Sequence, residues 1–273
     1  MEIFQYEFFR NAIAASILSS IVCSVIGVII VQKGLLMMSG GIAHTAYGGV
    51  GLAYLLGFSP MVGAAIFAVG GGLIIGRVKE KQLSNSDIII AMLWSVGMAL
   101  GIAFVGLMPG YPPDITSYLF GNILSVTKAD IKSAFILTCI VVLSFITFYN
   151  DWITFLFDEE FSAIRGIKTR FLSYFLLVLI SLTVVVLIRV AGIIMVIALL
   201  SVPASCSALL TEKFNLRILY SAILGTVFCL SGLFISYFFN IASGASIVIL
   251  SVLCYSAMFL IKEHGKKKKI DAE

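Results

Sequence analysis

Long apolar runs recur along the whole sequence, and each is close to the length that a helix needs to cross a lipid bilayer. The hydrocarbon core is about 30 Å thick, so a spanning helix takes roughly 20 apolar residues at about 1.5 Å of rise per residue. Hydrophobic residues make up 60% of the chain and charged residues only 12%, which is about half the charged share of soluble domains. We therefore predict an all-α integral membrane protein with a single transmembrane domain over residues 1–273. The predicted spans are 11–31, 35–57, 59–76, 88–108, 131–149, 171–188, 190–210, 218–239 and 244–261.

The predicted number of spans is about nine and depends on the junction at Arg189. This single residue separates the runs 171–188 and 190–210, which form either a tight hairpin or one broken element. The second arrangement would give eight spans.

The connections between the runs form two alternating sets that differ in charge. The first set holds most of the lysine and arginine residues and comprises Lys33 and residues 77–81, 165–170, 213–217 and 262–273. The second set comprises the N-terminus and residues 57–59, 109–130, 189 and 240–243. Cytoplasmic loops carry an excess of lysine and arginine, so we place the first set and the C-terminus in the cytoplasm. The net charge of +4 comes largely from the basic tail 262–273, which suits the anionic inner leaflet, and no basic face recurs that would bind nucleic acid.

The connection 150–170, on the predicted cytoplasmic side, carries the signals of a short helix. Asp158 is a typical N-cap residue, acidic residues follow in what would be the first turn, and Gly166 suits the position just after the last turn. Apolar and polar residues alternate between these ends with a period of about 3.6. We therefore predict an amphipathic helix over 158–167 on the cytoplasmic face, which either lies at the membrane interface or is where a partner protein would dock.

Glycine and other small residues are concentrated in the runs 35–57 and 59–76. Small residues allow helices to pack closely in lipid, where apolar burial does not drive helices together. The pattern fits a helix at the centre of the bundle. It also fits a helix that unwinds near a transport pathway and exposes its backbone carbonyl groups.

His44 is the one histidine or charged residue that lies away from the ends of the predicted spans. It is about nine residues into the run 35–57, roughly 14 Å deep and close to the bilayer midplane, where ionisable residues are costly. One interpretation is a structural histidine, hydrogen-bonded to a neighbouring helix. The other is a metal ligand, because neutral imidazole commonly binds transition metals. Two copies of His44 could face each other across a two-fold dimer axis, and a weak, incomplete site suits a conduit that must release its ion.

The sequence does not carry the residues of an enzyme. It has no HExxH motif, no paired carboxylates within the runs, no Ser/His/Asp set and no GxxxxGK[ST] phosphate-binding loop. We therefore predict no catalytic residues and no resident cofactor. Any ATP that powers transport must be hydrolysed by a partner.

Five stretches, in order along the chain, carry a family resemblance. They are 40–49 (GGIAHTAYGG), 118–124 (YLFGNIL), 157–163 (FDEEFSA), 197–204 (IALLSVPA) and 243–248 (SGASIV). In these residues and over nearly its whole length, the chain resembles the ABC-3 permeases, which are the membrane subunits of zinc, manganese and iron ABC importers.

The resemblance implies a type II importer permease that forms a translocation path as a homodimer in the cell membrane. It also implies two copies of a cytoplasmic ATPase and an external metal-binding protein that delivers the ion. The segment 158–167 would be the coupling helix that sits in a groove of the ATPase. Its expected contact residues are Asp158, Glu159, Glu160, Phe161, Ile164, Arg165 and Gly166.

The chain also departs from the family pattern. It has Gly40 where many members carry an acidic residue, Gly48-Gly49 where they carry Pro-Gly, and Glu159 where proline is usual. Loss of the carboxylate at position 40 removes a hard oxygen ligand, so zinc, manganese and iron all stay open as the transported ion. The alternatives are a permease for a metal chelate, such as a siderophore or corrinoid, and, more remotely, a membrane-embedded enzyme or assembly protein.

Overall fold

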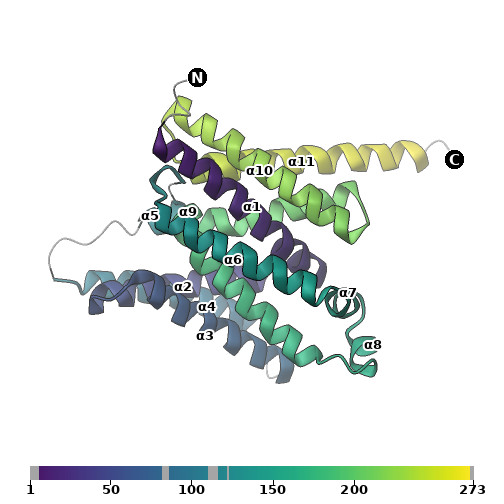
Figure 1. Ribbon diagram of the computed structural model, residues 1–273, viewed down its shortest axis with the longest axis horizontal. Helices are drawn as coiled ribbons and strands as arrows, with labels where there is room; N and C mark the ends of the chain where they lie inside the picture. The colour runs from purple at the N-terminus through teal and green to yellow at the C-terminus, as the bar shows by residue number, and fades with distance from the viewer. Residues whose placement is uncertain (1–5, 82–85, 110–115, 122, 271–273) are drawn as a thin grey trace.

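A computed structural model describes residues 6–81, 86–109, 116–121 and 123–270, with the backbone alone for residues 116, 124 and 265–270. The predicted outer residues Pro112, Pro113 and Asp114 and the side chains of the lysine tail therefore lie outside the described part. Each predicted span lies within a helix apart from at most two terminal residues (Figure 1). The helices are α1 (Glu7–Lys33), α2 (Leu36–Leu56), α3 (Pro60–Lys81), α4 (Ser86–Gly106), α5 (Thr116–Phe120), η2 (Ile123–Ser125), α6 (Lys128–Thr147), α7 (Tyr149–Phe157), α8 (Glu159–Ile164), α9 (Thr169–Leu210), α10 (Phe214–Phe239) and α11 (Ser243–Ile270).

Seven helices in the described part of the chain are long and apolar enough to cross a membrane. They are α1, α3, α4, α6, α9, α10 and α11. The helix α2 is not among them, although it has 21 residues, because its glycines and His44 lower its mean hydropathy. The helix α9 has 42 residues and contains two of the predicted spans. A total of nine spans thus stays a prediction.

The two predicted sets of connections lie at opposite ends of the bundle. The first set is joined by the contacts Lys33–Glu159, Arg170–Glu80, Arg217–Gln32 and Lys262–Leu209. The second set is joined by the contacts Glu7–Lys128, Arg189–Asp130 and Ile123–Ser243. We call these the basic end and the opposite end. The division into two ends is found in the structure, whereas the assignment of the basic end to the cytoplasm stays a prediction.

The break in α9 lies at Gly192 and not at Arg189. Gly192 has φ 73° and ψ 161°, inside an otherwise helical segment, and this backbone conformation is essentially restricted to glycine. Both ends of α9 lie at the basic end, because Arg170 pairs with Glu80 and the carbonyl group of Leu209 accepts from Lys262. The helix therefore runs to the opposite end, turns at Gly192 and returns.

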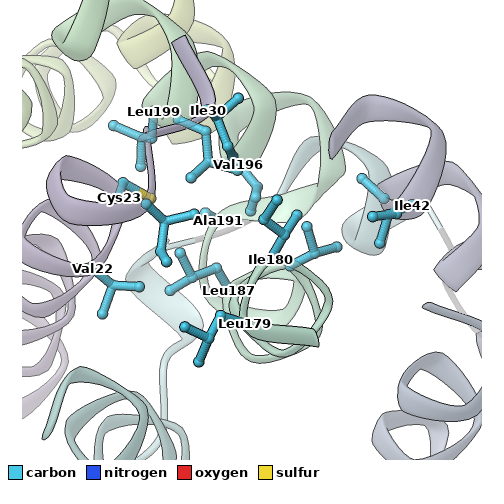
Figure 2. Packing of buried hydrophobic residues seen from close by; sticks show 14 of the residues in the cluster. Val22, Cys23, Ile30, Ile42, Leu179, Ile180, Leu187, Ala191, Val196 and Leu199 are labelled. Carbon is cyan, nitrogen blue, oxygen red and sulfur yellow. The ribbon is translucent and has the colours of Figure 1, made fainter. Parts of the chain in front are cut away.

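The core of the bundle lies between α1 and α9. Figure 2 shows apolar side chains of both helices interleaved, with Ile42 of α2 beside them. The labelled residues of α1 and α9 are Val22, Cys23, Ile30, Leu179, Ile180, Leu187, Ala191, Val196 and Leu199. In contrast, α4, α6, α10 and α11 expose large apolar side chains. Such faces suit lipid or another membrane helix.

The glycines of α2 serve close packing. A Cβ atom on Gly49 would collide with the carbonyl group of Gly63 in α3, and one on Gly51 would come within 2.8 Å of the Gly101 Cα atom in α4. The helix is continuous from Leu36 to Leu56. The possibility that this run unwinds is therefore wrong, and its small residues instead bring α2 into direct backbone contact with α3 and α4.

Candidate functional site

The predicted metal ligand, His44, lies near the middle of α2 and is almost completely buried, with 8% of its surface exposed. Its ring stacks on the Trp94 ring of α4, with centroids 3.9 Å apart and planes 20° from parallel. This approach needs glycine on both helices. A Cβ atom on Gly40 would meet the Trp94 ring at 2.9 Å, and one on Gly97 would meet the His44 carbonyl oxygen at 2.6 Å. Helix α4 thus covers one face of the imidazole.

The hydrogen bond at Nδ1 determines which His44 nitrogen could bind a metal ion. Nδ1 lies 2.9 Å from the carbonyl oxygen of Gly40, and a carbonyl oxygen only accepts, so Nδ1 donates. The neutral ring then carries its lone pair on Nε2, to which no described residue donates a hydrogen bond. Metal-binding histidines commonly hold their second nitrogen in this way. The interpretation of His44 as a structural histidine predicts a hydrogen bond to a neighbouring helix. No described residue on a neighbouring helix forms such a bond with His44.

The described residues of one chain do not form a complete metal site. No three of their histidine, cysteine, aspartate and glutamate side chains lie close enough to hold one ion. The backbone carbonyl groups of α2 do not supply the missing metal ligands, because this helix is unbroken. The carbonyl of Gly40 accepts from His44, and that of Gly41 accepts from the Thr45 hydroxyl at 2.7 Å. His44 could complete a site only with ligands from elsewhere, such as a second copy of the chain.

The predicted docking segment contains the short helix α8. Its N-cap is Asp158, whose carboxylate accepts a hydrogen bond from the Phe161 backbone N–H at 2.8 Å. After the last residue, Ile164, the chain leaves the helix through Gly166, which has φ 79°. Both ends therefore use the residues that the sequence singled out, because an Asp side chain can satisfy a free N–H and glycine tolerates a positive φ.

The apolar side chains of α8 point away from the rest of the protein. Ile164 is 83% exposed and Phe161 is 48% exposed, whereas the small Ser162 is buried. Figure 1 shows α8 at the edge of the molecule, beyond the long helices. Glu160 and Arg165 are exposed as well, with the Arg165 guanidinium 5.5 Å from the centroid of the Phe161 ring. This surface, which we call the α8 surface, is suited to contact a partner protein.

The helix α7 was missed by the sequence analysis, which assigned Tyr149 to a span and the following residues to a connection. Phe148 ends α6 and begins α7, so the chain changes direction there. Trp152 and Phe155 on α7 are buried. Their spacing on one helical face, together with Leu156, is the signal that could have identified this helix.

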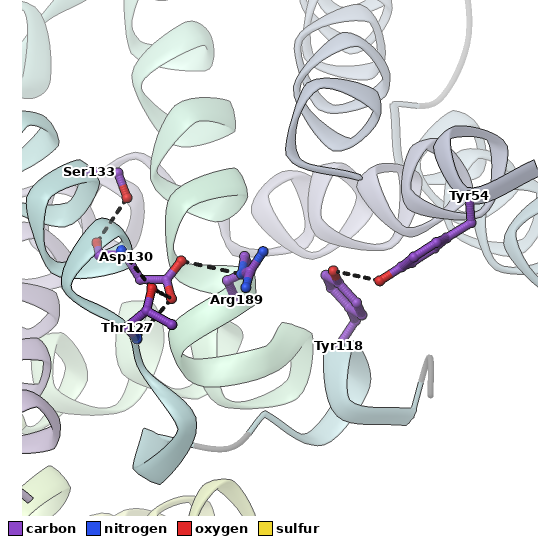
Figure 3. Close-up of polar contacts among 6 residues, drawn as sticks. All are labelled: Tyr54, Tyr118, Thr127, Asp130, Ser133 and Arg189. Carbon is purple, nitrogen blue, oxygen red and sulfur yellow. Dashed lines mark hydrogen bonds and ion pairs between the residues drawn. The ribbon is translucent and has the colours of Figure 1, made fainter. Parts of the chain in front are cut away.

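At the opposite end, two polar contacts join separate helices (Figure 3). The hydroxyl groups of Tyr54 in α2 and Tyr118 in α5 are 3.0 Å apart, and Arg189 in α9 pairs with Asp130 in α6 at 3.2 Å. Burial, followed by the hydrogen bond with Tyr54, raises the pKa of Tyr118 well above its usual value, so its phenol stays neutral. Of these four residues, the sequence singled out Arg189, as the junction between two runs, and Tyr118, as part of the family-like stretch 118–124, but not their contacts with Asp130 and Tyr54.

Two of the five family-like stretches, 118–124 and 243–248, meet beside this cluster, around Gly192. A Cβ atom on Gly121 would collide with the Ala191 carbonyl group, and one on Gly244 would collide with the Phe120 carbonyl oxygen. The backbone N–H of Ile123 also donates to the Ser243 hydroxyl at 3.2 Å. The stretches 118–124 and 243–248 thus support the turn in α9.

Comparison with known proteins identifies the family. The sequence profile of the ABC 3 transport family matches residues 5–262. The manganese transport system membrane protein MntC of Listeria innocua is 34% identical over 97% of this chain and 96% of its own. Among solved structures, PsaBC from Streptococcus pneumoniae, in complex with Fab, matches with a TM-score of 0.84 at 31% identity, covering 96% of this chain and 92% of that chain.

A second solved structure shows the fold alone. It is an inward-facing transporter proposed to be of the metal-chelate ABC type, with a TM-score of 0.76 at 16% identity, covering 97% of this chain and 88% of that chain. The family resemblance seen in the sequence is confirmed by the match to nearly the whole chain. This protein is a member of the ABC 3 transport family.

Proposed function

We propose that this chain is the membrane-spanning permease subunit of an ATP-driven importer of a divalent metal ion, with manganese as the first candidate. The observation that carries the proposal is the match, over nearly the full length of both chains, to a membrane protein named for manganese transport. The chain itself would not be an enzyme. A separate cytoplasmic ATPase would supply the energy, and an external metal-binding protein would deliver the ion.

In this proposal the ion passes His44 at the interface of a homodimer. The Nδ1 hydrogen bond to Gly40 leaves the Nε2 lone pair available, and the buried position excludes bulk water from the ring. Two Nε2 atoms from two subunits would supply only part of a coordination shell. Such a site binds weakly enough to release the ion, as transport requires.

Uptake by cells tests the substrate assignment. We expect cells that lack this chain to lose accumulation of Mn²⁺ supplied as the free ion, with uptake restored by the intact gene. Zn²⁺, Fe²⁺ and the same ions presented as siderophore chelates serve as the comparison. Restoration of chelate uptake alone would overturn the proposal in favour of a chelate permease.

The α8 surface is proposed to dock on the ATPase, and the change Ile164→Asp tests this. Ile164 is the most exposed apolar side chain on α8, and burying a carboxylate in an apolar contact is costly. We expect ATPase binding to weaken by at least about tenfold, measured by co-purification and by titration of the purified membrane protein with the ATPase. The change Glu160→Lys should weaken binding too, by reversing a charge on the same surface.

Leu210→Asp is the matched control for Ile164→Asp. Leu210 is also an exposed apolar residue at the basic end, but it lies at the end of α9 and outside the α8 surface. We expect this variant to bind the ATPase as the unchanged protein does. Equal binding by the Ile164→Asp and Leu210→Asp variants would show that α8 is not the docking segment.

A further inference from the structure

Lys33, the last residue of α1, contacts both short helices at the basic end. Its ammonium nitrogen lies 3.8 Å from the centroid of the Phe155 ring in α7 and 3.1 Å from a carboxylate oxygen of Glu159 in α8. Only 14% of the Lys33 side chain is exposed, whereas lysine usually extends into solvent. The end of α1 is therefore held against α7 and α8 by a cation–π contact and an ion pair.

The ion pair between Lys33 and Glu159 connects α8 to the long helix α1. The Asp158 carboxylate and the Ser162 hydroxyl form hydrogen bonds inside the segment, and Ile167 donates to the Ser162 carbonyl group at 3.0 Å. Within the described residues, the bond from Lys33 to Glu159 is the polar contact between α8 and a membrane helix. This pair therefore connects α8 directly to α1.

The space beside this link is partly open. A cavity of about 340 Å³ is lined by residues of α1, α2, α3, α7 and α9 and by Glu159. Its wall also carries the pair formed by Arg170 and Glu80, which are 3.0 Å apart. Two ion pairs thus face the cavity, together with Lys79. The cavity leaves room in which α8 could shift.

We propose that Lys33 and Glu159 are positioning residues that transmit movement of α8 to α1 and to the start of α2. This inference rests on the proposed function, in which the ATPase binds the α8 surface. In this arrangement Glu159, which the family resemblance assigns to the ATPase contact, also pairs with Lys33 of its own chain. Only the turn at Gly34 and Leu35 separates Lys33 from α2, the helix that carries His44. A displacement of α8 thus has a direct route to the proposed ion site.

A charge-swap experiment tests the link in the reconstituted complex with its ATPase. The variants are Lys33→Glu, Glu159→Lys and the double variant that carries both changes. Glu159 is 55% exposed but Lys33 only 14%, so folding and ATPase binding of all three variants are measured before transport. We expect each single change to lower the number of ions transported per ATP hydrolysed by about tenfold. The double variant should recover most of this loss.

Lys128→Glu is the matched control. Lys128 forms an ion pair with Glu7 at 2.8 Å, but at the opposite end and with both side chains largely exposed. We expect transport per ATP to be unchanged in this variant. A double Lys33/Glu159 variant as defective as the two single changes combined would overturn the inference.

The same assay separates failure of this inference from failure of the proposed docking. If Ile164→Asp abolishes ATPase binding while the charge swap gives no recovery, α8 docks but the Lys33–Glu159 link does not transmit its movement. If Ile164→Asp leaves ATPase binding intact, the docking proposal itself fails, and the link inference fails with it.

Discussion

Replacing Gly192 with alanine is expected to prevent the chain from accumulating as a folded membrane protein. The glycine has φ 73° and ψ 161°, and a non-glycine residue in this region costs about 1–3 kcal/mol from the backbone alone. An added Cβ atom would also collide with the backbone of Gly121 and come within 2.6 Å of the Phe120 carbonyl carbon. Neither neighbour can move aside as a flexible side chain could. We expect a total loss of at least about 3 kcal/mol, measured as the yield and thermal midpoint of monodisperse protein in detergent.

Gly70→Ala provides the control for this prediction. Gly70 lies inside α3, and an added Cβ atom would meet open space. Alanine favours helix over glycine by up to about 1 kcal/mol, so the Gly70→Ala variant should be as stable as the original protein or slightly more stable. Comparable stability of the Gly192→Ala and Gly70→Ala variants would show that the turn in α9 does not require glycine.

Replacing His44 with alanine is expected to abolish metal uptake while the protein remains folded and bound to its ATPase. The change removes the Nε2 lone pair that is proposed to meet the ion, and even loss of a supporting residue typically weakens metal sites by about 10–100-fold. We therefore expect uptake of Mn²⁺ to fall by at least about 100-fold. Mn²⁺ uptake is measured with the purified complex in proteoliposomes. Radioactive Mn²⁺ is supplied outside the vesicles and ATP on the side that carries the ATPase.

Two further variants make the His44 result specific. His264→Ala removes the second histidine, which is exposed near the end of α11, and should leave uptake unchanged. Trp94→Leu removes the ring that stacks on His44 and should reduce uptake less than His44→Ala does, because the imidazole remains. Normal uptake by the His44→Ala variant would exclude this residue from the ion path.

Much of the fold could be predicted because lipid imposes a simple rule on sequence. A spanning helix must satisfy its own backbone and present apolar side chains, so long apolar runs reveal where helices lie. The distribution of lysine and arginine also divided the connections correctly between the two ends of the bundle. The break in α9 was misplaced at Arg189 because charge is visible in a sequence, whereas the need for a positive φ at Gly192 arises from a turn that no local pattern reveals.

The candidate site was less predictable because its contacts join residues that are distant in sequence. The sequence singled out His44 from its depth in a span, but the stacking on Trp94 depends on how α2 meets α4. Likewise, Asp158 and Gly166 could be recognised as helix-end residues from their own chemistry. The pairing of Lys33 with Glu159 joins residues 126 positions apart, and only the folded chain brings them together.

The backbone contacts of α2 with α3 and α4 have a consequence for how the protein could move. Where glycine faces glycine, as at Gly49 with Gly63 and Gly51 with Gly101, the two backbones meet directly, and a backbone contact has no rotamer that could change to let the helices slide. The three helices are therefore expected to travel as one rigid block, with any hinge placed where they meet the rest of the bundle. Such a block would carry His44 and Trp94 together. Alternating access would then rotate the stacked imidazole and indole rings as one unit and would not separate them.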